Sequence, residues 1–169
     1  MKKKLVRRIT DNALIAAIYY VITILMAGQA FYDIQFRFAE IFIFLVFFRK
    51  DFIVGVTLGC FLANLHSPLW PWDPIFGTLA TLVSGLLVAY SRKLVMGIIY
   101  PTIINGLVVG TMLYILIEAP LLPSIGLVAL GEFVVLLLGH AIFKILSQKK
   151  EFLRLIMATR TEGEDLENE

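Results

Sequence analysis

Long stretches without a charged side chain divide this sequence, and they limit its fold more than any other feature. Residues 12–32, 52–72, 74–91 and 94–117 contain no Asp, Glu, Lys or Arg, and residues 119–143 contain only Glu132. A helix needs about 20 apolar residues to cross the hydrocarbon core of a bilayer. Hydrophobic residues make up 59% of the chain and charged residues 17%, which is unlike the balance of a soluble domain. We therefore predict an all-α integral membrane protein.

A sixth and shorter apolar segment lies between the first two of these stretches. Residues 34–48 are apolar and aromatic, with Arg37 and Glu40 as their only charged members. This composition predicts a short span that follows the first one. We expect Pro101, within residues 94–117, either to kink its helix or to mark a late start.

Three prolines predict where the third span ends. Pro68, Pro71 and Pro74 follow Asn64 closely, and proline disfavours a continuous helix. We expect the third span to stop near Leu65 and a loop to run to about Pro74.

The basic residues predict the orientation of the spans. With a cytoplasmic N-terminus and six spans, every Lys and Arg except Arg37 falls on the cytoplasmic side, and removing one span would move later basic clusters outside. We predict a six-helix transmembrane domain in residues 1–150 with both termini cytoplasmic. Residues 151–169 form a polar cytoplasmic tail, and its end, 161–169, has too little apolar surface to fold. Topology explains the basic clusters, so they do not indicate nucleic-acid binding.

The sequence lacks the motifs of common enzyme classes. It contains no H-E-x-x-H, no G-x-S-x-G and no G-x-x-x-x-G-K-[ST]. His66 in a predicted loop and His140 near the end of the last span provide no evident base for a nucleophile. We therefore expect a non-catalytic protein without cofactor or metal, and one that cannot drive transport with ATP by itself.

Ionisable and amide side chains inside predicted spans are the first candidates for ligand contact, because such groups are costly in a bilayer. Glu132 lies well inside the last span and either contacts a ligand or makes a buried hydrogen bond. Arg37 and Glu40 are spaced i, i+3, so they either contact a ligand or pair with each other at the interface. Asn105 either contacts a ligand or joins two helices.

The loop after the third span adds aromatic candidates. Trp70 and Trp72 are either interfacial belt residues or a cover that stacks on a flat heteroaromatic ligand. Asp73 is either an exposed loop acid or a carboxylate at the mouth of the site. We include Asn64, where the loop begins, among the candidate ligand contacts.

Small residues in the first span predict a partner surface. Ala13 and Ala17 form a small-xxx-small pair, with Ala16 beside them, and such pairs let another helix approach closely. Two glycine pairs have the same spacing, and we interpret them as internal packing: Gly55 with Gly59 and Gly106 with Gly110.

Several sequence runs together resemble the QueT family, over approximately residues 10–146. They are Ile34-Gln-Phe-Arg37-Phe-Ala-Glu40, Gly59-Cys-Phe-Leu-Ala-Asn64 through Ser67-Pro68-Leu69, Phe76-Gly-Thr-Leu-Ala-Thr81 and Gly131-Glu132. QueT proteins are substrate-binding S components of energy-coupling factor (ECF) transporters for queuosine precursors.

The resemblance implies a fold, partners and a mechanism. It implies a six-helix bundle in a prokaryotic plasma membrane, with a ligand cavity toward the outer side that loops close. It implies a membrane T component and two cytoplasmic ATPase subunits as partners. Ala13 and Ala17 occupy the place where S components dock on the T component, and transport then proceeds by toppling of the whole subunit.

The chemistry of a 7-deazaguanine suits the candidate residues. One carboxylate can accept from its ring N–H and exocyclic amine, and its carbonyl needs a donor. We assign Glu132 to the first role and Asn105 or Arg37 to the second, while Glu40 or Asp73 would pair with an aminomethyl ammonium. A folate or another pterin presents a similar edge and is the alternative ligand, and a small intramembrane enzyme is the alternative class.

Overall fold

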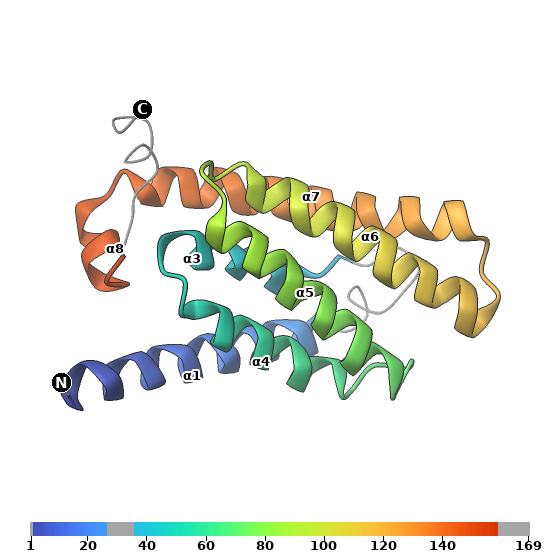
Figure 1. Cartoon of the computed structure of the whole chain (residues 1–169), viewed down its shortest axis with the longest axis horizontal. Helices are drawn as coiled ribbons and strands as arrows, with labels where there is room; N and C mark the ends of the chain where they lie inside the picture. Colours follow the sequence, from blue (N-terminus) through green and yellow to red (C-terminus); the bar gives the residue numbers. More distant parts are fainter. Residues whose placement is uncertain (1, 27–35, 159–169) are drawn as a thin grey trace.

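The computed structural model describes residues 2–26 and 36–158, which fold into helices joined by short connections (Figure 1). The elements are α1 (Lys2–Leu25), η1 (Phe38–Phe42), α3 (Ile43–Phe48), α4 (Phe52–Asn64), α5 (Trp72–Tyr90), α6 (Met96–Ile117), α7 (Leu121–Ser147) and α8 (Lys150–Leu155). No strand occurs within the described ranges. The predicted all-α class is therefore confirmed for this part of the chain.

Four helices in the described part of the chain have the length and apolar composition to cross a membrane: α1, α5, α6 and α7. Two apolar helical segments are shorter, Phe38–Phe48 and Phe52–Asn64. At about 1.5 Å per residue, the second of these extends roughly 20 Å, less than the ~30 Å hydrocarbon core. The helices support a membrane protein, while six spans and cytoplasmic termini stay a prediction.

Several helix boundaries differ from those expected from the charge pattern. Helix α1 begins at Lys2 rather than near residue 12, so its first turns carry basic side chains. Helix α4 ends at Asn64, which confirms the expected end near Leu65. Helix α5 begins at Trp72, before Pro74. Proline is tolerated in a first helical turn, where its missing N–H leaves no bond unmade, so the loop is shorter than expected.

Pro101 lies inside α6, which begins at Met96. The alternative of a late start for this span is therefore wrong. A helix that contains proline satisfies the freed backbone groups through its neighbours in a packed bundle.

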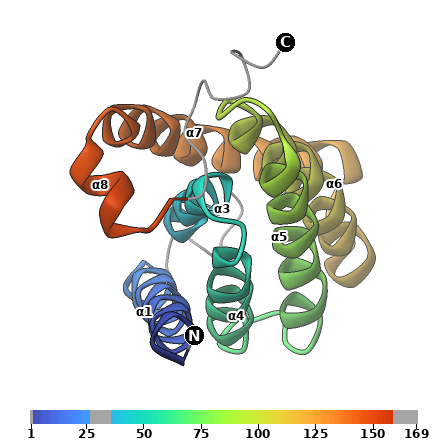
Figure 2. The same ribbon diagram turned by 60° about the vertical axis from the view of Figure 1, so that its left-hand side comes forward.

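Helices α4 to α7 pack in chain order around a central element, and α1 packs on α4 (Figure 2). The central element is η1 followed by α3, and all six residues of α3 are buried. A helix that is apolar on every face belongs to a protein interior or to lipid, and here the interior surrounds it. The segment predicted as a second span is thus a short central helix covered by other helices.

The basic segments gather at one end of the molecule, which we call the basic end. The start of α1, the α3–α4 and α5–α6 turns and α8 lie there, while the α4–α5 and α6–α7 connections lie at the other end (Figure 1). The predicted topology requires the basic segments to share one end in this way.

Arg49 joins three segments at the basic end. It is 1% exposed and forms ion pairs of 2.9 Å with Asp11 and with Asp51. It also donates a 2.6 Å hydrogen bond to the carbonyl oxygen of Ile156. These contacts hold the residues after α8 against α1 and the α3–α4 turn, so the described part of the predicted tail packs on the bundle. The end of that tail, 161–169, lies outside the described residues.

Glycines allow two helix pairs to approach closely. A Cβ atom on Gly59 would lie 2.7 Å from Cβ of Tyr19 and 2.9 Å from the carbonyl oxygen of Ala16. A Cβ on Gly110 would lie 2.6 Å from Cα of Ile125 on α7. The other member of each pair has similarly close neighbours, so the predicted internal packing is confirmed.

We expect Gly59→Ala to lower the free energy of unfolding by about 1–3 kcal/mol, because α1 must move away from α4 to admit the methyl group. Gly126→Ala is the matched control, since a Cβ there meets nothing within 4 Å. Thermal unfolding in detergent measures both variants. Equal melting temperatures for the two would contradict the close contact between α1 and α4.

Candidate functional site

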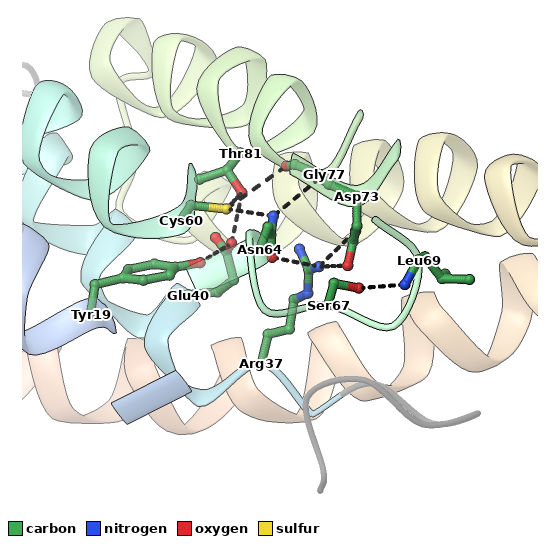
Figure 3. Close-up of polar contacts among 10 residues, drawn as sticks. All are labelled: Tyr19, Arg37, Glu40, Cys60, Asn64, Ser67, Leu69, Asp73, Gly77 and Thr81. Carbon is green, nitrogen blue, oxygen red and sulfur yellow. Dashed lines mark hydrogen bonds and ion pairs between the residues drawn. The ribbon is translucent and has the colours of Figure 1, made fainter. Parts of the chain in front are cut away.

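Buried polar side chains from four elements meet beside the α4–α5 connection (Figure 3). Together with the backbone of Gly77 on α5 they form what we call the polar cluster: Tyr19 of α1, Arg37 and Glu40 at η1, Cys60 and Asn64 of α4, and Asp73 and Thr81 of α5. Each ionisable or amide side chain among them is at most 5% exposed. The cluster brings together four residues predicted from sequence, namely Arg37, Glu40, Asn64 and Asp73.

Arg37 pairs with Asp73. Its Nη2 atom lies 3.1 Å and 3.3 Å from the two carboxylate oxygens of Asp73, and 3.2 Å from Oδ1 of Asn64. The alternative in which Arg37 pairs with Glu40 is therefore wrong. Arg37 precedes the helical turn with a non-helical backbone, so the i, i+3 spacing does not put the two side chains on one face.

Asp73 is 1% exposed, so the alternative of an exposed loop acid is wrong, while its contact with a ligand stays a prediction. Because α5 begins at Trp72, Asp73 lies in the first helical turn and its side chain faces the bundle. Asn64 supports this arrangement by donating from Nδ2 to the backbone oxygen of Asp73 at 3.3 Å.

Glu40 receives two hydrogen bonds on the same oxygen. The hydroxyl of Tyr19 donates to Oε1 at 2.6 Å, and the hydroxyl of Thr81 donates to it at 2.7 Å. Such short O–H···O distances are typical of charge-assisted bonds to a carboxylate. The other oxygen, Oε2, is buried and has no hydrogen-bond partner within residues 2–26 and 36–158.

Four members of the cluster were missed by sequence reasoning: Tyr19, Cys60, Gly77 and Thr81. A Cβ on Gly77 would lie 2.8 Å from Nδ2 of Asn64 and from Oδ1 of Asp73, so a side chain there would displace the ion pair. The signal that could have found two of them is helical periodicity, because Asp73, Gly77 and Thr81 recur every four residues along one face of α5.

A second polar pair joins α6 and α7. Asn105 and Glu132 are each 1% exposed, and Nδ2 of Asn105 donates to Oε1 of Glu132 at 3.2 Å. Asn105 thus forms the interhelical hydrogen bond that was one of its two alternatives. Glu132 lies within electrostatic range of Glu40 and Arg37, which relates this pair to the polar cluster.

Three buried atoms of these groups lack a hydrogen-bond partner among the described residues: Nη1 of Arg37, Oε2 of Glu40 and Oδ1 of Asn105. Other partnerless atoms occur in the described chain, on threonine hydroxyls and on the ring of His140. The three atoms named first differ because they belong to charged or amide groups. An unsatisfied buried polar group costs about 1–3 kcal/mol, so one donor and two acceptors are available to a polar ligand.

The two tryptophans lie away from these groups. Trp70 is 65% exposed. Trp72 is 45% exposed, stacks on Phe76 with ring centroids 6.1 Å apart, and lines an apolar hollow with residues of α6. The structure therefore brings neither ring to the polar cluster, and the predicted cover over a ligand stays a prediction.

The alanines of α1 face two different environments. Ala16 is 3% exposed and packs against Gly59, so it belongs to the α1–α4 contact. Ala13 and Ala17 are exposed and leave a shallow surface on α1.

Known proteins resemble this chain over most of its length. Residues 9–148 match the family described as QueT transporter. The chain belongs to the QueT transporter family. A curated relative from Lactococcus lactis subsp. cremoris, "Queuosine precursor transporter QueT", is 31% identical over 170 residues, covering 91% of this chain and all of the relative. No solved structure matches the chain.

Family membership confirms the resemblance inferred from the sequence runs and the expectation that this protein is no enzyme. QueT proteins are transporters, so their shared activity is transport. The apolar helices described above agree with a membrane transporter.

Proposed function

We propose that this chain is the substrate-binding S subunit of an ECF importer and that it binds a queuosine precursor built on a 7-deazaguanine ring. The observation that carries the proposal is the group of partnerless buried atoms on Arg37, Glu40 and Asn105. The relative that is named as a queuosine precursor transporter supports the choice of ligand.

The polar groups suggest how the ring is held. In this scheme Glu132 accepts from the ring N–H and the exocyclic amine, and Nη1 of Arg37 donates to the carbonyl. Asn105 already donates to Glu132, so it orients that carboxylate and offers its oxygen as a further acceptor. Asp73 is engaged by Arg37, which leaves Glu40 to pair with an aminomethyl ammonium.

Toppling in the membrane fits the closed basic end. Between the polar cluster and that end lies α3, whose residues are all buried. The rings of Phe44 and Phe48 on α3 pack against those of Phe143 and Phe152. Neighbouring ring centroids in this group are 5.8–6.2 Å apart. We infer that a ligand in the cluster does not pass through this packing. A subunit that admits and releases its ligand by one opening must then reorient as a whole, driven by ATPase partners.

Titration of the purified chain tests the ligand. We expect a 7-deazaguanine to bind with a Kd far below that of folate or a pterin in direct competition, and native mass spectrometry identifies any small molecule that survives extraction. A bound pterin would keep the role of the subunit and replace its ligand. Failure to bind either class would contradict the proposal.

Docking on the T component is tested on the exposed face of α1. We expect Ala13→Trp together with Ala17→Trp to abolish co-purification with the T component, because two indoles prevent close helix approach. Deazaguanine binding by the isolated variant should be unchanged. Ala141→Trp, at an exposed alanine of α7, is the matched control and should co-purify normally. Normal co-purification of the double variant would exclude this face as the docking surface.

A further inference from the structure

We propose that Tyr19 and Thr81 act as a clamp that orients Glu40 and so selects ligands that carry a positively charged ammonium group. The inference rests on the proposed function and deepens it, because it assigns the residues that set specificity at the site. The clamp is defined by the two hydrogen bonds that both hydroxyls donate to Oε1 of Glu40.

The clamp fixes the direction in which the carboxylate points. Tyr19 reaches Glu40 from α1 and Thr81 reaches it from α5, so the carboxylate is held from two separate helices. A turn of the carboxylate away from this orientation would lengthen both short bonds. With Oε1 occupied, Oε2 is the acceptor that remains, and it is buried without a partner among the described residues.

The charges around Glu40 favour a cation over a neutral donor. Arg37 is engaged by Asp73, and Glu40 forms no ion pair with any described residue. The carboxylates of Asp73 and Glu40 thus lie near a single guanidinium, and all three residues are buried. A buried carboxylate without a counter-ion is costly, and a ligand ammonium would offset that cost.

Two ligands of equal shape isolate the charge. The probes are 7-aminomethyl-7-deazaguanine and 7-ethyl-7-deazaguanine, which differ in an ammonium replacing a methyl group. We expect the wild-type protein to bind the ammonium ligand at least about tenfold more tightly. Tyr19→Phe should raise the Kd of the ammonium ligand by roughly three- to tenfold, because Oε2 of Glu40 loses its fixed direction. The Kd of the ethyl ligand should rise by less than about twofold, because that ligand makes no bond to Oε2.

Matched variants separate positioning from general damage. Tyr20→Phe removes the neighbouring hydroxyl, which lies 3.5 Å from Nε2 of His66, and should change neither affinity. Thr81→Val should reduce the preference as Tyr19→Phe does, whereas Thr81→Ser keeps the hydroxyl and should restore it. Thr78→Val, which removes a partnerless hydroxyl from the same helix, is the control for Thr81→Val.

Each outcome separates the clamp from the proposed function. A preference for the ammonium ligand that falls in Tyr19→Phe and Thr81→Val and returns in Thr81→Ser supports the clamp. Tight binding of both ligands with the same ratio in all variants overturns the clamp and leaves the deazaguanine site intact. A wild-type protein that binds neither ligand overturns both the clamp and the ligand class.

Discussion

Replacing Arg37 by methionine is expected to lower the free energy of unfolding by about 3–5 kcal/mol, a larger loss than that expected for Gly59→Ala. Arg37 and Asp73 are 5% and 1% exposed, and their atoms approach to 3.1 Å. Methionine fills similar space without charge, so Asp73 would stay buried without its counter-ion. Oδ1 of Asn64 would also lose the hydrogen bond that Arg37 donates to it. Denaturant unfolding in detergent, followed by tryptophan fluorescence, gives the free energy.

Two further variants make this result interpretable. Arg8→Met removes an exposed arginine from α1 and should change the free energy of unfolding by no more than about 0.5 kcal/mol. The double variant Arg37→Met with Asp73→Leu removes both charges and should recover much of the lost stability, because an apolar pair of similar volume often replaces a buried ion pair without loss. A double variant no more stable than Arg37→Met would show that the ion pair is not what matters at this position.

Glu132→Gln is expected to weaken binding of a 7-deazaguanine by about 1–3 kcal/mol, or roughly 5- to 150-fold in Kd. Glutamine has nearly the same shape, and its oxygen can still accept the hydrogen bond from Asn105. It cannot accept from two ligand N–H groups at once, because one of its two terminal atoms is a donor. The fold should persist, since glutamine fills the same space without leaving a cavity.

Isothermal titration of the purified variant measures this loss, with Glu118→Gln as the control. Glu118 follows α6, is exposed, and lies outside the polar region, so its replacement should leave the Kd unchanged. Unchanged affinity in Glu132→Gln would show that the pairing of this carboxylate with the ligand edge is wrong, while the membership in the QueT family would stand.

Several features of the site could be predicted from the sequence, because they follow from the free-energy cost of placing a polar side chain in an apolar segment. Glu132 and Asn105 stand out in apolar stretches, and a polar group there must find a partner or a ligand. The structure places both in the interior, joined to each other. Their contact with a ligand stays a prediction.

Other features could not be predicted, because they depend on which distant residues meet. Arg37 and Asp73 are separated by 36 positions, and no local spacing shows that they pair. Tyr19 reads as one more aromatic residue of an apolar helix, although its hydroxyl holds Glu40 across 21 positions. Tyr19 therefore had no sequence signal of its own, whereas the periodicity of α5 could have pointed to Thr81.

The sequence by itself determined that this chain is helical, apolar and of the QueT type. Long uncharged stretches must form helices in a membrane, since only helices satisfy their backbone hydrogen bonds within one segment. Only the tertiary structure decided that α3 is covered by protein and that Asp73 rather than Glu40 pairs with Arg37. The physical reason is that lipid and protein interiors are equally apolar, so composition cannot tell them apart, and buried charges are neutralised by whichever groups the fold brings within reach.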